Sequence, residues 1–174
     1  MRKKIVITGG IGYIGTELCK IYSGVSRHNE IVVLDNRFIS ERVNQLRDWG
    51  IEFIHGDILD YDLMKEILND ADVVHHLAGI TDVARTLGES NEEKDKKHNL
   101  VALRGVENLI KAVNKDCKII FPSTHVIYEG LTSIKRNITE DEPPKPILAY
   151  PTSKLQNEKQ IKDSGKKYVI LRLG

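Results

Sequence analysis

Short apolar runs alternate with helical patterns along the whole chain. The runs are rich in Val and Ile, which is typical of parallel strands covered on both faces. The predicted strands are Lys4–Thr8, Ile31–Leu34, Glu52–His55, Val73–Leu77, Lys118–Phe121 and Tyr168–Leu171. The predicted helices are Gly12–Ser23, Glu41–Trp49, Tyr61–Leu68, Asn91–Asn114 and Tyr150–Ser164. We expect Ser90 to cap the fourth helix, and Pro151 suits the first turn of the fifth.

This alternation predicts an α/β fold with a doubly wound parallel sheet, a three-layer Rossmann fold. The turn after the first strand favours the strand order 3-2-1-4-5-6. Ligands of such sheets bind outside the carboxyl ends of the strands, which directs attention to Asp35, Asp57, Leu77–Thr81 and Ser123–Tyr128. The segment Glu129–Ala149 contains three prolines and is predicted to be a long loop.

Four glycines, Gly9, Gly10, Gly12 and Gly15, follow the first strand and lead into the first helix. Such a turn lets backbone N–H groups approach a pyrophosphate, and the following helix directs its positive end at the same phosphates. Asp35 ends the second strand, twenty residues after Gly15. Its carboxylate can accept both hydroxyls of an adenosine ribose and would repel a 2′-phosphate, so the spacing predicts an NAD site rather than an NADP site. We interpret Arg37 as a solvated cation or an adenine-stacking group.

Tyr150 and Lys154 are four residues apart and share one face of the last predicted helix. A free tyrosine has a pKa of about 10 and is a poor base near neutrality. Lowering that pKa by ~3 units takes about 4 kcal/mol, which a nearby lysine and an oxidised nicotinamide could supply together. Thr124 lies just past the predicted fifth strand, where its hydroxyl could bond the substrate oxygen, and Ser123 is the neighbouring candidate.

Composition excludes several other classes. A chain of 174 residues suits one domain, and a net charge of +1 provides no basic field for nucleic acid or an anionic membrane. The sequence shows no membrane-spanning run and no signal-peptide pattern. Cys19 and Cys117 stand in apolar contexts without metal spacing. We expect core thiols, no metal site and a reducing, cytoplasmic setting.

Six motifs in order resemble the extended short-chain dehydrogenase/reductase family, in its NAD-dependent sugar epimerase/dehydratase branch. They are Thr8–Gly15, Gly56–Ile58, Leu77–Gly79, Asn99, Ser123–Tyr128, and Tyr150 with Lys154. The resemblance implies that Thr124, Tyr150 and Lys154 are catalytic. It implies cofactor contacts from Gly9, Gly12, Tyr13, Ile14, Gly15, Asp35, Asn36, Asp57, Ile58, Leu77, Ala78, Gly79, Asn99, Tyr150 and Lys154.

The reaction implied is transient oxidation of a nucleotide-sugar hydroxyl by NAD, with Tyr150 as base, followed by return of the hydride to the other face of the sugar. UDP-glucose 4-epimerases are the nearest comparison, which suggests a UDP-linked substrate and a homodimer formed through the two longest helices. The 4,6-dehydratases of the family usually have Asp-Glu where this chain has His125 and Val126, so a dehydratase is less favoured. A ketoreductase and a non-catalytic dinucleotide-sensing module remain alternatives. Residues 1–174 correspond to the NAD-binding domain, and the family's C-terminal substrate-binding region is absent from them.

Overall fold

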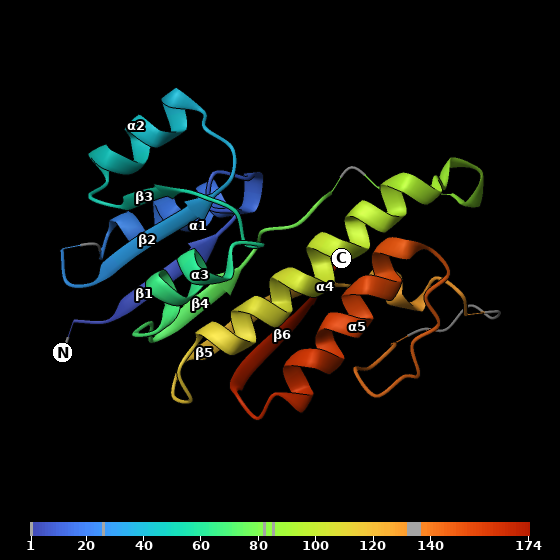
Figure 1. The fold of residues 1–174 in the computed structure, drawn as a ribbon. Coiled ribbons are helices and arrows are strands. Elements are labelled where there is room, and N and C mark those ends of the chain that lie inside the picture. The colour runs from blue at the N-terminus through green and yellow to red at the C-terminus, as the bar shows by residue number, and fades with distance from the viewer. Residues whose placement is uncertain (1, 26, 82, 85, 132–136) are drawn as a thin grey trace.

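The computed structural model describes residues 2–25, 27–81, 83–84, 86–131 and 137–174. One six-stranded parallel sheet runs through the centre of the protein (Figure 1). Its strands are β1 Lys4–Thr8, β2 Glu30–Asp35, β3 Glu52–His55, β4 Val73–His76, β5 Lys118–Thr124 and β6 Lys167–Leu173. Their order is β3-β2-β1-β4-β5-β6, which confirms the predicted doubly wound topology.

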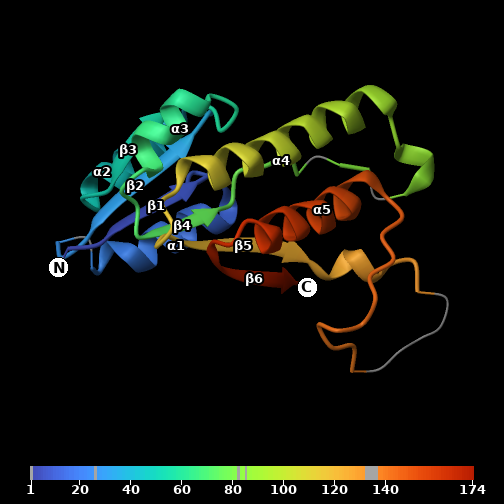
Figure 2. The same cartoon turned by 60° about the horizontal axis from the view of Figure 1, so that its bottom comes forward.

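Five α-helices connect the described strands, and each lies where the periodicity predicted it within two residues at either end. They are α1 Tyr13–Ser23, α2 Ser40–Asp48, α3 Tyr61–Leu68, α4 Glu92–Ala112 and α5 Ala149–Asp163. Two short 3₁₀ helices, η1 Leu87–Glu89 and η2 His125–Tyr128, were not predicted. In Figure 2 the long helices α4 and α5 lie side by side across one face of the sheet, and α5 contacts β5 and β6.

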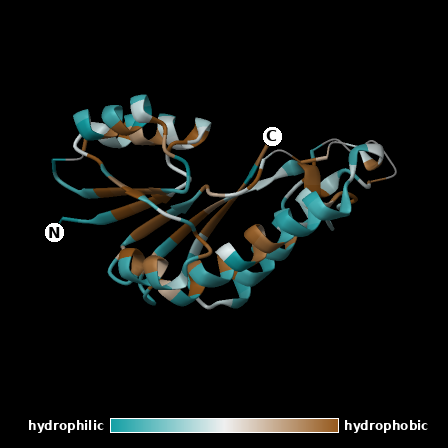
Figure 3. Ribbon diagram, turned by 45° about the horizontal axis from the view of Figure 1, so that its top comes forward, coloured by the Kyte–Doolittle hydropathy of each residue, from teal (hydrophilic) through white to brown (hydrophobic). Residues whose placement is uncertain are grey.

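Strand residues alternate between two apolar layers, one on each face of the sheet. Val6 and Leu34 pack with α3, α4 and α5, in a layer that also contains Met64, Leu109 and Ile161. Ile5, Ile7, Ile31 and Val33 pack on the opposite face with Cys19 of α1 and Leu46 of α2. Figure 3 shows the hydrophobic strands enclosed between helices whose outer faces are hydrophilic. The two apolar layers therefore hold the sheet between the helices, and the carboxyl ends of its strands lie outside these layers.

The structure corrects three sequence expectations. The edge strands β3 and β6 are not covered on both faces, and Leu171 of β6 is 45% exposed. β5 continues past Phe121 to Thr124, so the candidate hydroxyl lies inside the strand end. Helix α4 is capped by the side chain of Asn91, which accepts from the N–H groups of Glu93 and Lys94, and not by Ser90.

The predicted long loop after η2 is tied to the start of α5. The carboxylate of Glu129 accepts hydrogen bonds from the N–H groups of Ile147 and Leu148, at 2.7 and 2.9 Å. Arg172 of β6 donates to the carbonyl of Glu140 at 2.9 Å. Residues 132–136 of this loop lie outside the described residues. The described part thus fixes how the chain enters α5.

Both cysteines are buried in the core, as predicted, and burial raises the pKa of the Cys19 thiol to about 12 and that of Cys117 to about 11. Among the described residues, no helix is long and apolar enough to cross a membrane. The same part of the chain contains no group of three or more His, Cys, Asp or Glu side chains placed to hold a metal ion.

We expect Gly9→Ala to destabilise the fold strongly. Gly9 has a φ of +73°, and an added Cβ would lie 2.7 Å from the backbone nitrogen of Ala78. Gly165 has a similar φ of +69° but no atom near the Cβ position, so Gly165→Ala isolates the cost of the dihedral, about 1 kcal/mol. The backbone overlap at Gly9 should add ~1–3 kcal/mol. Urea unfolding measures both, and equal losses would contradict the steric argument.

Candidate functional site

The glycine turn forms an open cradle between β1 and α1. The Gly9 N–H donates to the carbonyl of Leu34 at 2.7 Å, and the Gly12 N–H donates to the carbonyl of Gly9 at 3.0 Å. An added Cβ on Gly15 would lie 2.5 Å from the Gly9 oxygen, so the helix can approach the turn only with glycine at this position. Gly12 precedes the first residue of α1 and offers no side chain to cap it. The first N–H groups of α1 are therefore available to an anion.

Two large side chains beside this cradle are turned outward. Tyr13 is 85% exposed and Ile14 is 51% exposed, in the first turn of a helix whose buried residues are Gly15 and Cys19. A cradle shaped by glycine and bordered by exposed apolar side chains fits a dinucleotide, because it combines anion-binding N–H groups with surface for flat rings.

The carboxylate of Asp35 lies at the end of β2 beneath this turn and is 5% exposed. It accepts from the N–H of Ile11 at 3.3 Å and from the N–H of Arg37 at 3.0 Å. The Arg37 guanidinium pairs with the same carboxylate at 3.4 Å while remaining half exposed. Arg37 is therefore an ion-pair partner of Asp35, a role that neither sequence interpretation included.

Asn36 and Asp57 meet next to Asp35. The amide nitrogen of Asn36 donates to the Asp57 carboxylate at 3.0 Å, and the other carboxylate oxygen accepts from the Leu59 N–H at 2.9 Å. Ile58, in contrast, has its side chain in the core, and its carbonyl accepts from Asn108 at 2.9 Å. Asn36 and Asp57 thus lie together at the end of β2, whereas the side chain of Ile58 is in the core.

The end of β4 closes the other side of the cradle. The Leu77 N–H donates to the carbonyl of Thr8 at 3.0 Å, and the Ala78 N–H donates to the Thr8 hydroxyl at 3.3 Å. His76 bonds that hydroxyl through Nδ1 at 2.9 Å. Gly79 is exposed, and an added Cβ there would meet no atom within 4 Å. Leu77 and Ala78 therefore pack against Gly9 of the turn, and open space begins beside Gly79.

The three candidate catalytic side chains gather where β5 ends and α5 begins. Thr124 is 6% exposed, and its hydroxyl oxygen accepts from the Val126 N–H at 3.2 Å, which leaves its proton for another acceptor. Lys154 Nζ donates to the carbonyl of Pro122 at 2.8 Å. It also lies 4.6 Å from the centre of the Phe121 ring and 5.9 Å from that of Tyr150. The structure therefore brings a hydroxyl, a cation and a phenol together.

Burial shifts the pKa values of this group in a way that the sequence did not predict. The pKa of the Lys154 ammonium is lowered to about 8 by burial, and no carboxylate among the described residues pairs with it. Burial also raises the pKa of the Tyr150 phenol, so Lys154 alone does not make it a phenolate. Burial and the Lys154 charge lower the pKa of His76 to about 3, which keeps that imidazole neutral.

The hydroxyl of Ser123, the alternative candidate, already forms a hydrogen bond within the protein. It donates to the carboxylate of Glu158 at 2.6 Å, and Arg172 donates to the same carboxylate from Nε at 3.1 Å and Nη2 at 2.8 Å. Burial alone would raise the pKa of Glu158, but the bonds from Arg172 and Ser123 lower it overall. Of the two neighbouring hydroxyls, Thr124 is the one left for a ligand.

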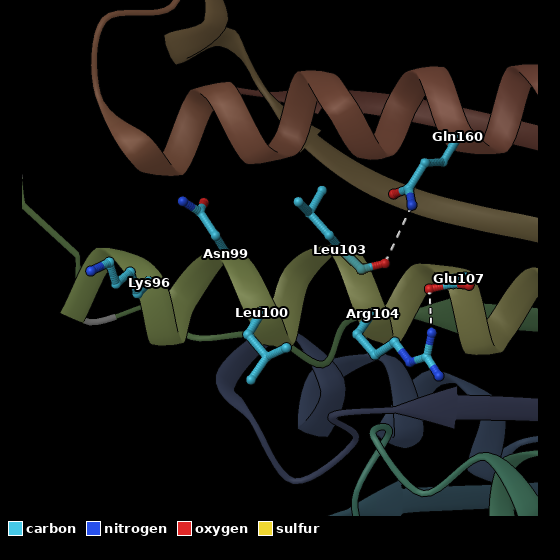
Figure 4. Close-up of a pocket in the computed structure, with 7 residues that line it drawn as sticks. All are labelled: Lys96, Asn99, Leu100, Leu103, Arg104, Glu107 and Gln160. Carbon is cyan, nitrogen blue, oxygen red and sulfur yellow. Dashed lines mark hydrogen bonds and ion pairs between the residues drawn. The ribbon is translucent and has the colours of Figure 1, made fainter. Parts of the chain in front are cut away.

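Asn99 is the predicted site residue that the structure does not bring to this group. It lines a surface groove between α4 and α5 with Leu103 and Gln160 (Figure 4). Its neighbour His98 is buried instead and contacts both Ser153 and Tyr150. The rotation of α4 about its own axis explains why His98 is buried and Asn99 is not, because the buried face of the helix contains Gly105, Leu109 and Ala112. Extending this stripe back by two turns reaches His98, a signal in the sequence that could have identified it.

Comparison with known proteins agrees with this geometry. Residues 5–174 match the model of the NAD dependent epimerase/dehydratase family. CDP-paratose 2-epimerase of Salmonella typhi is 33% identical over 146 residues, which are 79% of this chain and 41% of that protein. UDP-glucose 4-epimerase of Haemophilus influenzae is 33% identical over 172 residues, 93% of this chain and 48% of that protein.

A solved structure has the same fold. The UDP-glucose 4-epimerase from Brucella ovis in complex with NAD is 30% identical, with a TM-score of 0.79 over 98% of this chain and 51% of that one. The chain thus spans less than half of the length of the two curated relatives. The match to the family model covers nearly all of the sequence, and the chain therefore belongs to the NAD-dependent epimerase/dehydratase family.

Proposed function

We propose that residues 1–174 form the NAD-binding domain of a nucleotide-sugar epimerase, in which Tyr150 is the base. The observation that carries this proposal is the meeting of Thr124, Tyr150 and Lys154 at the same sheet edge as the glycine cradle and Asp35. The relatives named above support the class of substrate, since their names specify CDP- and UDP-linked sugars.

NAD would supply the hydride acceptor, and the chain would bind it, orient it and manage one proton. The N–H groups at the start of α1 would hold the pyrophosphate, and Asp35 the adenosine ribose. Thr124 would donate to the reacting oxygen of the sugar. Tyr150 would remove the hydroxyl proton as the carbon is oxidised and return it when the hydride comes back to the other face. Lys154, the nearby ammonium, would stabilise the phenolate.

Three alternatives differ from this proposal. A dehydratase needs an acid and a base to eliminate water, but Thr124 is followed here by His125 and Val126, and His125 bonds the carbonyl of Leu173 at 3.1 Å. A ketoreductase would use the same three side chains and differs in exchanging its cofactor at each turnover. A sensing module has no use for a hydroxyl, phenol and ammonium placed together, so the catalytic assignment is favoured.

We further propose that two copies pair through α4 and α5. The outer surface of α4 carries Leu100, which is 59% exposed, next to the groove lined by Leu103 and Gln160. Pairing two such helices from each copy would form a four-helix bundle and cover this apolar surface.

Replacing Asp35 by asparagine should weaken the preference for NAD over NADP. The change keeps the size of the side chain but removes the charge that binds ribose hydroxyls and repels a 2′-phosphate. Charged hydrogen bonds contribute about 1.5–3 kcal/mol, so the ratio of the NADP and NAD dissociation constants should fall roughly tenfold or more. Calorimetry measures both constants. Asp48→Asn, at an exposed position in α2, is the control, and an unchanged ratio in Asp35→Asn would remove Asp35 from the proposal.

Replacing Tyr150 by phenylalanine should strongly slow the oxidation of the sugar and leave the binding of NAD intact. In a chain that carries the family's substrate-binding region as well as these residues, we expect the reduction of bound NAD after addition of UDP-glucose to slow roughly a hundredfold or more, since the phenol is the proton acceptor. The dissociation constant of NAD should stay within about twofold, as the ring remains in place. Stopped-flow absorbance of the reduced nicotinamide reports the rate. Tyr168→Phe, on the half-exposed edge strand β6, should behave as wild type. Wild-type reduction in Tyr150→Phe would reject the mechanism.

The buried ammonium of Lys154 predicts a pH-dependent stability difference. Its pKa falls from 10.5 to about 8 on folding, so below pH 8 the folded state bears the full cost of burying the charge. This cost disappears as the pH rises from about 8 to 10.5. Lys154→Met should therefore be more stable than wild type at pH 7, by roughly 3 kcal/mol, and equal to it above pH 10.5. Denaturant unfolding between pH 7 and 10.5 measures this stability difference. The control is Lys159→Met, at an exposed position of α5, whose stability difference from wild type should not change with pH.

A further inference from the structure

Helix α4 places one polar side chain against the start of α5, and no step of the proposed reaction uses it. His98 is 4% exposed and bonds the hydroxyl of Ser153 through Nε2 at 2.7 Å. Its ring also packs on that of Tyr150, with centroids 5.8 Å apart and planes tilted by 52°. A buried histidine in contact with the candidate base from a different helix is well placed to fix its position.

The Ser153 hydroxyl lies between His98 and the backbone of Tyr150. Its oxygen is 2.7 Å from Nε2 of His98 and 2.8 Å from the carbonyl oxygen of Tyr150. The tautomer of His98 determines which of these two groups receives the hydroxyl proton. The backbone of Ile80 is close enough to the imidazole to favour its protonated form. In either tautomer the contacts run from His98 through Ser153 to the backbone of the base.

The charge environment keeps His98 neutral. Burial lowers the pKa of the imidazole, and the Lys154 cation lowers it further, while Asp95 and Ile80 act in the opposite direction. At neutral pH His98 therefore adds no second positive charge beside Tyr150. Its effect on the phenol must come from position rather than from charge.

We propose that His98 is a positioning residue that holds Tyr150 in its reactive orientation, through ring contact and through Ser153. This inference rests on the proposed role of Tyr150 as the base. A proton acceptor must lie within hydrogen-bond reach of the sugar hydroxyl, and small displacements cost large factors in rate. Tyr150 is the second residue of α5, where a helix frays most easily. His98 anchors this first turn from the neighbouring helix α4.

Two substitutions separate the two contacts. His98→Phe keeps a ring against Tyr150 and loses the bond to Ser153, whereas His98→Gln keeps a donor and loses the ring. Each should slow NAD reduction by UDP-glucose about tenfold and leave the dissociation constant of NAD within about twofold. Ser153→Ala should reduce the rate of NAD reduction as much as His98→Phe does. The double variant His98→Phe/Ser153→Ala should be no slower than either single variant, because both substitutions remove the same hydrogen bond. Ser153→Ala adds no bulk, so it keeps the test available if the histidine variants fold poorly.

A second measurement does not depend on turnover. Tyrosine labelled with ¹³C at Cζ gives a resonance for Tyr150 that is identified by its loss in Tyr150→Phe. This resonance should shift or broaden in His98→Gln and in Ser153→Ala, and stay unchanged in His28→Gln, at an exposed histidine. An unmoved resonance in both variants, or additive rate losses in the double variant, would overturn the inference. If Tyr150→Phe still reduces NAD, the proposed function fails, while the resonance still reports whether His98 positions the ring.

Discussion

One hydrogen bond, from the Lys154 ammonium to the carbonyl of Pro122, connects the two elements on which the candidate site depends. Thr124 follows Pro122 by two residues on β5, and Tyr150 precedes Lys154 by one turn on α5. The bond therefore sets the register between hydroxyl and phenol. The carbonyl is available on the β4 side because β4 pairs with β5 only up to Ile120. The Phe121 ring, with its centre 4.6 Å from Nζ, contacts the same ammonium.

The fold follows from the sequence because its signals are local. Alternating strands and helices with right-handed connections permit few sheet orders, and the position of the glycine turn selects among them. The predicted ends of the strands were less accurate where pairing with a neighbouring strand determines how far a strand extends. A proline at position 122 argues against a strand, yet β5 continues through it because β6 pairs with it as far as Thr124. The burial of edge strands β3 and β6 likewise depends on what lies beside them, which alternation of residues does not report.

The residues of the candidate site also differ in whether the sequence alone could locate them. The glycine turn and Asp35 could be located from the chain alone, since a strand, a tight turn and a helix fix their relative positions within one unit. The inward side chain of α4 was missed, because the buried stripe that leads back to His98 ends among charged residues and tertiary packing fixes the rotation of the helix. Gly105 lies so close to Ile58 that an added Cβ would be 2.4 Å from its Cδ1. That contact turns His98 inward and Asn99 outward, and the charged first turns of the helix conceal the apolar stripe that would have shown it.

Burial acts on the candidate base and on its neighbouring cation in the same direction. It disfavours both the phenolate of Tyr150 and the ammonium of Lys154, so each group by itself is shifted toward its neutral form. The same low-polarity surroundings strengthen the attraction between the two charges once both exist. In the proposed reaction, a ligand that covers these groups would strengthen that attraction and raise the free-energy cost of either charge alone. Proton removal would then be coupled to substrate binding, and a fixed phenol would make the coupling effective because the attraction depends on its distance from Nζ.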